Sequence, residues 1–216
     1  CYRLALLVAQ RLLVVPSEDK GTVVVFKLGG GAGATAAAWL LHGGPEGDEG
    51  GRFEEPISVI VAPGGRQLVV VDNGKHQLQC FDLETRRHLW TVGEEGSGAG
   101  QLSQPTDATY TRDGGLAVMD CDNHRISLRT AAGEPTGTLG SEGSGDGQLK
   151  DPMSIACCPR TGRLLVADKN NHRVAMWDEK GVWVGTIGAG EGAGEGQLKS
   201  PRTVAVDGSS GLVLVG

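Results

Sequence analysis

The sequence predicts an all-β fold, a β-propeller built from four-stranded antiparallel blades. Two observations lead to this prediction: short apolar runs bounded by turn residues, and a repeat of nearly constant length. The acid that closes the second run of each repeat recurs every 48 residues, at Asp72, Asp120 and Asp168. A histidine keeps the same interval, at His76, His124 and His172. A period of roughly 20 to 50 residues is typical of solenoids and propellers, and four strands in each unit favour a propeller.

Residues 145–188 contain one complete unit, in which four short patterns are expected to be strands. These patterns cover residues 153–158, 163–168, 172–177 and 182–187. Each pattern is long enough for a strand and too short for a globular helix. The gaps between them carry Gly or Asn, which accept the positive φ angles of hairpin turns. We therefore expect each unit to be an antiparallel meander.

The other units are placed by comparison with this one. A degenerate first blade is expected to have strands at 4–8, 11–15, 22–26 and 36–41, with Pro16 at the Asp position and a Gly/Ala-rich insertion at 29–34. Continuing the interval of 48 beyond Asp168 puts the next Asp position at Gly216. The boundaries predicted within one propeller domain are a first blade at 1–45, repeats at 46–93, 94–140 and 141–188, and a partial repeat at 189–216.

Two motifs accompany the repeat. A lead-in Gly-x-Gly-Gln-Leu-x-x-Pro occurs at 98–105, 145–152 and 194–201. A signature Asn-His-Arg, preceded by Val-x-Asp, occurs at 123–125 and 171–173. In these motifs the chain resembles the NHL repeat proteins, with a weaker match in the repeat that contains His76. The resemblance implies an NHL-type propeller, and because that family commonly closes with six blades, we expect about four and a half repeats of a longer ring.

The signature residues are expected to be structural. An Asp that ends a strand before a tight turn usually accepts backbone N–H bonds, and the imidazole and Asn are expected to hold the turn between the second and third strands. Residues one repeat apart lie on successive blades, so they should not converge as zinc ligands or as a catalytic carboxylate pair. The predicted structural signature is Asp72, His76, Asp120, Asn123, His124, Arg125, Asp168, Asn171, His172 and Arg173.

Motifs for catalysis are missing from the sequence. It has no Gly-x-Ser-x-Gly elbow, no Gly-Lys-Ser/Thr phosphate loop and no Cys-x-x-Cys pair. The five cysteines are an odd number, which favours reduced thiols and a cytoplasmic location. No apolar run reaches the ~18 residues needed to cross a bilayer. We predict a non-catalytic protein with no catalytic residue, metal or cofactor and no membrane insertion.

Charge separates the two faces of the predicted propeller. The long-loop face, which holds the inter-blade loops and the turns between second and third strands, is acidic. The short-turn face, which holds the other turns, is mixed. The net charge of −6 and the content of 4% aromatic residues disfavour RNA binding, because a surface that binds polyanions needs basic or stacking side chains. The candidate partner-binding loops carry Glu94, Glu95, Glu142 and Glu191.

The predicted function is a non-catalytic protein–protein interaction module. The NHL resemblance, which extends to tripartite-motif proteins, implies the substrate-recognition part of a larger ubiquitin-ligase-type protein. Two alternatives remain open at this point. One is a metal-dependent lyase or hydrolase with its site at the propeller axis, and the other is an RNA-binding NHL domain.

Overall fold

The computed structural model describes residues 5–7, 12–17, 21–27, 36–42 and 52–216. The chain divides into two compact units, Cys1–Glu95 and Gly96–Gly216. Every strand pairing in the described residues is antiparallel between consecutive strands, and the one helical element among them is the 3-10 turn η3 (Lys169–Asn171). The prediction of an all-β fold with four-stranded meanders is confirmed. Within this described part, no helix is long and apolar enough to span a membrane.

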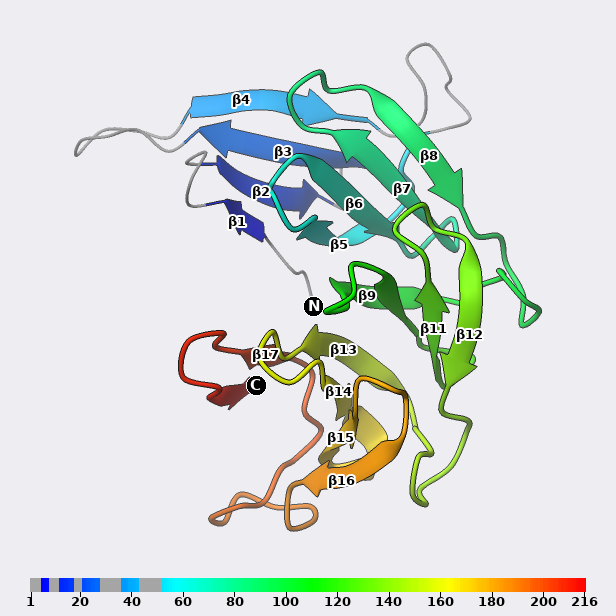
Figure 1. Ribbon diagram of the computed structural model, residues 1–216, viewed down its shortest axis with the longest axis vertical. Helices are drawn as coiled ribbons and strands as arrows, with labels where there is room; N and C mark the ends of the chain where they lie inside the picture. The colour runs from blue at the N-terminus through cyan, green and yellow to red at the C-terminus, as the bar shows by residue number, and fades with distance from the viewer. Residues whose placement is uncertain (1–4, 8–11, 18–20, 28–35, 43–51) are drawn as a thin grey trace. The chain divides into compact units, whose positions relative to one another are not determined.

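The first unit contains two four-stranded sheets, which we call blade 0 and blade 1 (Figure 1). Blade 0 consists of β1 (Ala5–Leu7), β2 (Leu12–Ser17), β3 (Thr22–Lys27) and β4 (Ala36–Leu41). Blade 1 consists of β5 (Pro56–Val61), β6 (Gln67–Asp72), β7 (Gln77–Asp82) and β8 (His88–Val92). Their shared core brings Val14, Val23 and Val25 against Val59, Leu68 and Phe81.

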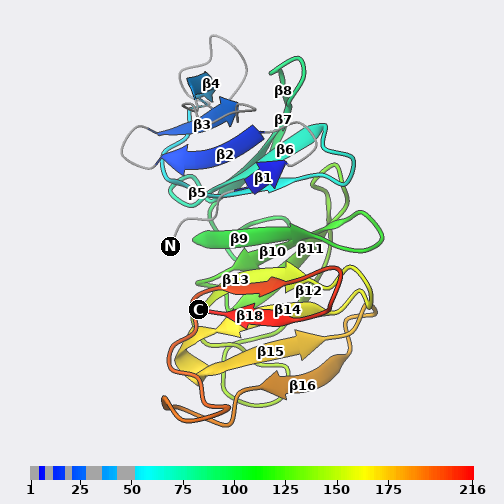
Figure 2. The same ribbon diagram turned by 90° about the vertical axis from the view of Figure 1, so that its left-hand side faces the viewer.

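The second unit contains blades 2 and 3 and a two-stranded blade 4 (Figure 2). Blade 2 consists of β9 (Pro105–Tyr110), β10 (Leu116–Asp120), β11 (Arg125–Arg129) and β12 (Pro135–Leu139). Blade 3 consists of β13 (Pro152–Cys157), β14 (Leu164–Asp168), β15 (Arg173–Trp177) and β16 (Trp183–Ile187). Blade 4 consists of β17 (Val204–Val206) and β18 (Val213–Val215). The innermost strands β9, β13 and β17 are neighbours in this order.

Burial follows the position of a strand within its blade. All five residues of β10 and all five of β14 are buried. In blade 3, residues of β14 pack against blade 2 on one face and against blade 4 on the other. Such strands have continuous apolar sequences such as Leu-Leu-Val-Ala rather than alternation. The outermost strands β12 and β16 are largely exposed. Core residues such as Ile126, Ile155 and Trp177 join blades 2 and 3.

Strand pairing corrects two predicted positions. In blade 4, Val206 pairs with Val213 as Cys157 pairs with Leu164 in blade 3. Gly216 therefore corresponds to Ala167, and the prediction that it stands at the Asp position is wrong. The loop before Pro201 is one residue longer than the loop before Pro152, so the interval in this blade is 49 residues instead of 48.

In blade 0 the last pair of the second hairpin is Ser17 with Thr22, as Asp72 with Gln77 is in blade 1. Ser17, rather than Pro16, is thus at the Asp position. The expected turn between the first two strands and the Gly/Ala-rich insertion at 29–34 lie outside the described residues.

Side chains connect the innermost strands of the second unit. The carboxylate of Asp107 on β9 accepts bonds from the Ser154 hydroxyl (2.8 Å) and the Ile155 N–H (3.0 Å) on β13. The Ser154 oxygen in turn accepts from the N–H of Val204 on β17 (3.3 Å). An innermost strand has a free edge whose N–H groups need partners. Each blade here supplies an acceptor for the edge of the next.

Candidate functional site

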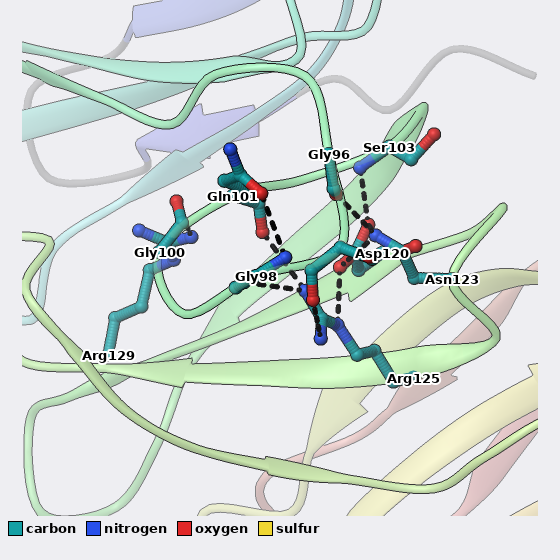
Figure 3. Close-up of polar contacts among 10 residues, drawn as sticks. Gly96, Gly98, Gly100, Gln101, Ser103, Asp120, Asn123, Arg125 and Arg129 are labelled. Atoms are coloured by element: carbon teal, nitrogen blue, oxygen red, sulfur yellow. Dashed lines mark hydrogen bonds and ion pairs between the residues drawn. The ribbon is translucent and has the colours of Figure 1, made fainter.

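The signature of blade 2 is built around the buried carboxylate of Asp120 at the end of β10 (Figure 3). It accepts bonds from the Ser103 N–H (2.6 Å), the Asn123 amide (2.9 Å) and the Arg125 Nε (2.7 Å). Arg125 is the strand partner of Asp120, so the guanidinium and the carboxylate start side by side. Burying a carboxylate is expensive unless it is paired and hydrogen-bonded, and these three donors meet that need.

The same donors hold the lead-in loop. Arg125 donates to the carbonyl oxygens of Ser97 (2.8 Å), Gly98 (3.2 Å) and Gln101 (3.1 Å). Asn123 donates to the carbonyl of Gly96 (2.9 Å). Figure 3 shows Asn123, in the turn between β10 and β11, and Arg125, at the start of β11, both directed toward the loop. The signature therefore clamps residues 96–105 onto their own blade.

Blade 3 repeats this arrangement. Asp168 accepts from the Lys150 N–H (2.8 Å), the Asn171 amide (2.8 Å) and the Arg173 Nε (2.7 Å). Arg173 donates further to the carbonyls of its lead-in, at Ser144, Gly145 and Gln148. Its guanidinium carbon also lies 5.6 Å from the centre of the Trp183 ring, which is cation–π range.

In each lead-in, the side chain of a glutamine leaves no room for a side chain at the first glycine of the loop. In the three lead-ins the glutamine Oε1 accepts the N–H of the glycine three residues earlier, at 2.9 to 3.0 Å. Two residues before that glycine, Gly143 has φ +144°, and a Cβ there would lie 2.4 Å from the Gln148 oxygen. Gly96 and Gly192 show the same conflict. The spacing Gly-x-Gly-x-Gly-Gln is thus a compact turn closed by its own side chain.

The histidines act on the following blade rather than on their own turn. The Nδ1 atom of His124 accepts the N–H of Asp151 (3.2 Å), and that of His172 accepts the N–H of Ser200 (3.1 Å). Both histidines have left-handed backbones, with φ near +50° (51° and 54°). Their Nε2 atoms face Glu142 (4.0 Å) and Glu191 (3.7 Å). The sequence predicted a bond within the turn, and the structure places the bond between blades.

The signature of blade 1 is reduced. Asp72 is fully buried and accepts the N–H groups of Glu54 (3.1 Å) and Glu55 (2.9 Å), but Gln77 occupies the position of the arginine. Burial raises the pKa of Asp72 above its usual range, against the effect of these backbone donors. His76 shares the left-handed backbone of the other two histidines, with φ 55°.

The candidate partner-binding carboxylates Glu94, Glu95, Glu142 and Glu191 are all exposed. Glu142 and Glu191 occupy the same repeat position, one residue before the strained lead-in glycine, with side chains 75% and 58% exposed. Each of these two carboxylates lies close to the signature histidine of the preceding repeat, His124 or His172. Among the described residues, no three His, Cys, Asp or Glu side chains are positioned to hold a metal ion.

Two further polar groups escaped the sequence analysis. One is the pair Asp107 and Ser154, two residues after the proline that opens each blade. The signal for it was available, since oxygen-bearing side chains occupy this position in every repeat, at Ser58, Asp107, Ser154 and Thr203. The other is Asp151, which pairs with the Lys169 ammonium (2.5 Å) and accepts a hydrogen bond from the Cys121 thiol (3.4 Å). Lys169 holds the pKa of Asp151 below its usual range.

The thiols differ in the direction in which their surroundings shift the pKa. The Thr161 hydroxyl and nearby N–H groups lower the pKa of Cys158, whereas burial raises the pKa of Cys157 and raises that of Cys80 to about 12. The thiolate is the nucleophile. With limiting iodoacetamide near neutral pH, in a Cys1→Ser background, we expect peptide mass spectrometry to show Cys158 alkylated first. Thr161→Val should slow this labelling, and modification of Cys157 ahead of Cys158 would contradict the assignment.

Comparisons with known proteins support the fold. No family model matches the chain, and no curated protein matches it significantly. Among solved structures, hydrazine synthase of Kuenenia stuttgartiensis is similar over 74% of this chain, with a TM-score of 0.58 and 17% sequence identity. The chain spans 41% of the length of that protein. At this identity the similarity concerns the fold alone, and with the repeated four-stranded sheets it shows a β-propeller architecture.

Proposed function

We propose that the chain is an NHL-type repeat module that binds protein partners and catalyses no reaction. Its role in a larger ubiquitin-ligase-type protein would be to recognise the substrate. The NHL assignment is supported by the recurrence of the Asp, Asn and Arg cluster on blades 2 and 3 with the same partners in both. The proposed interaction role rests on the exposed loop carboxylates, which take no part in that cluster.

One observation carries the proposal: the polar side chains of the signature bind one another and the backbone of the lead-in. Asp168, for instance, is completely buried and surrounded by donors from three residues. Polar groups that are buried and fully hydrogen-bonded in this way have a structural role and are not available to a substrate. The same bonds fix the inter-blade loops, so that carboxylates such as Glu142 and Glu191 stand exposed on a rigid support. Binding residues on loops over a rigid scaffold are a general arrangement.

The long-loop face fits a basic protein partner. Opposite charges on two proteins accelerate association, and salt screens this effect over a Debye length of ~8 Å at physiological ionic strength. The net charge of −6 acts in the same direction. A polyanion such as RNA would be repelled.

The test is charge reversal on this face. Lysine at Glu94, Glu95, Glu142 and Glu191 should weaken retention of partners from a lysate about tenfold or more, while the circular dichroism spectrum stays that of a folded β protein. Association of the wild-type chain with such a partner should slow as salt rises.

A matched pair of double variants controls for charge alone. Glu142→Lys with Glu191→Lys alters the long-loop face, and Glu84→Lys with Glu134→Lys alters the short-turn face, where both residues are also exposed. Equal loss of partners in the two doubles would refute the assignment to the long-loop face. Tight recovery of RNA by the wild-type chain would instead favour the RNA-binding alternative.

A further inference from the structure

A groove lies between blades 2 and 3 on the short-turn face of the second unit. Its volume is about 900 Å³, and turns from both blades line it. The β9–β10 and β11–β12 turns contribute one wall, and the β15–β16 turn contributes the other. All these residues belong to one compact unit. The groove lies at the opposite ends of these strands from the signature clusters, whose bonds are on the long-loop side.

The floor of the groove is aliphatic. Leu116 and Leu164 are buried beneath it, and Leu128 and Leu139 are partly exposed to it. A partly covered leucine retains apolar surface that a ligand can remove from water, at roughly 25 cal/mol for each Å². An aliphatic side chain is the group that fits such a floor.

The rim carries charges of both signs, but they are not equally available. The Asp113 carboxylate accepts the Thr111 hydroxyl (2.5 Å), and Asp178 accepts the N–H groups of Lys180 (3.0 Å) and Val182 (2.8 Å). Both carboxylates keep their charge, but these bonds hold them within their own turns. In the part of the chain that the structure describes, no carboxylate forms an ion pair with the Lys180 ammonium.

Arg112 is the second available cation. It reaches across the groove to Glu179 (3.2 Å), and the two side chains are 55% and 51% exposed. Exposed ion pairs contribute only about 0–1 kcal/mol, so an incoming carboxylate can compete with Glu179 for the guanidinium. The rim thus offers cations, and the floor offers leucine side chains.

We propose that this groove binds an extended peptide segment of a protein partner, in which an aliphatic side chain lies next to an Asp or Glu. The aliphatic group occupies the floor between Leu128 and Leu139, and the carboxylate pairs with Lys180 and Arg112. This inference rests on the proposed function as a protein-binding module and adds a second surface of different chemistry to it. The long-loop face selects basic partners, and the groove selects an acidic, apolar motif.

The experiment is selection of a phage library of random linear decapeptides on the whole chain, followed by affinity measurements with the enriched peptides made synthetically. We expect enrichment of sequences that combine Leu, Ile or Val with Asp or Glu. Thr136→Trp, which fills the groove from β12, and Lys180→Glu should each weaken these peptides about tenfold or more. Thr138→Trp on the same strand, and Lys199→Glu on the long-loop face, should leave the affinity unchanged.

The outcomes separate the two proposals. Enriched peptides that are basic, and that lose binding in the Glu142→Lys, Glu191→Lys variant, would overturn the groove and leave the proposed function in place. Acidic, aliphatic peptides that bind Thr136→Trp and wild type equally would overturn the groove as their site. Failure to enrich any peptide overturns the groove proposal too, whereas the proposed function depends on the lysate experiment.

Discussion

Asp168→Asn should lower the free energy of unfolding by about 3–5 kcal/mol, the usual result of removing one partner of a buried ion pair. The carboxylate is fully buried, and the Arg173 side chain that it pairs with at 2.7 Å is 13% exposed. Asparagine keeps one acceptor oxygen but leaves the guanidinium charge without its counter-charge. The measurement is urea denaturation followed by Trp fluorescence, since Trp177 and Trp183 lie in the same blade.

Asp72→Asn is the matched control. This Asp is equally buried and occupies the same repeat position, but backbone N–H groups rather than a guanidinium bind it. The substitution should therefore cost little or be stabilising at neutral pH. The double variant Asp168→Asn, Arg173→Met should recover part of the loss in blade 3. Equal losses from Asp168→Asn and Asp72→Asn would contradict the ion-pair interpretation.

The effect of Asp72→Asn on the free energy of unfolding should also depend on pH. Burial raises the pKa of Asp72, so the folded state holds this proton more tightly than the unfolded chain, where the value is about 3.9. The carboxyl then destabilises the fold increasingly as pH rises from the unfolded value through the folded one. The stability of Asp72→Asn relative to wild type should therefore increase from pH 4 to pH 7.

Asp107→Ala is expected to cost about 2–4 kcal/mol, because the change strands two buried groups on the next blade. The Ile155 N–H and the Ser154 hydroxyl both donate to this carboxylate, and Asp107 and Ser154 are 2% and 6% exposed. Amide hydrogen exchange should become faster at Ile155 in particular, in addition to the loss seen by urea denaturation.

Asp107→Asn serves as the conservative variant, since both bonds end on the same oxygen, Oδ2, and the amide oxygen can take its place. It should restore most of the protection at Ile155. If Asp107→Ala and Asp107→Asn are equally unstable, the negative charge rather than the two bonds explains the role of the residue. Unchanged exchange at Ile155 in the alanine variant would show that the bond between the blades carries no stability.

The repeat made most of the fold predictable. A strand pattern that occurs once is ambiguous, but the same pattern recurring every 48 residues fixes the number of strands in each unit. Strand ends were displaced by about one residue, as for β14, which begins at Leu164 and not at Arg163. Gly216 and Pro16 were misassigned because counting along the chain cannot locate an inserted residue. The pairing of β17 with β18 and of β2 with β3 shows which residues stand at the Asp position.

The site was predictable only where its contacts are local. Asp120 and Arg125 face each other across one hairpin, so their pairing follows from a spacing of five residues. The acceptors on the lead-in are backbone carbonyls, which any sequence would supply and which therefore leave no signal. His124 binds a residue 27 positions later, on another blade. The groove depends on the shape left between two turns, and no motif encodes it.

The bonds that backbone N–H groups donate to side chains of a neighbouring blade have a common direction in the second unit. In the second unit, the side-chain acceptors His124, His172, Asp107 and Ser154 belong to the earlier blade, and the N–H groups of Asp151, Ser200, Ile155 and Val204 that they bind belong to the later one. A ribosome releases the earlier blade first, and domains generally fold in that order during synthesis. Each emerging strand therefore meets acceptors that are already in position. Each completed blade of this unit thus presents the hydrogen-bond acceptors for the blade that is synthesised after it.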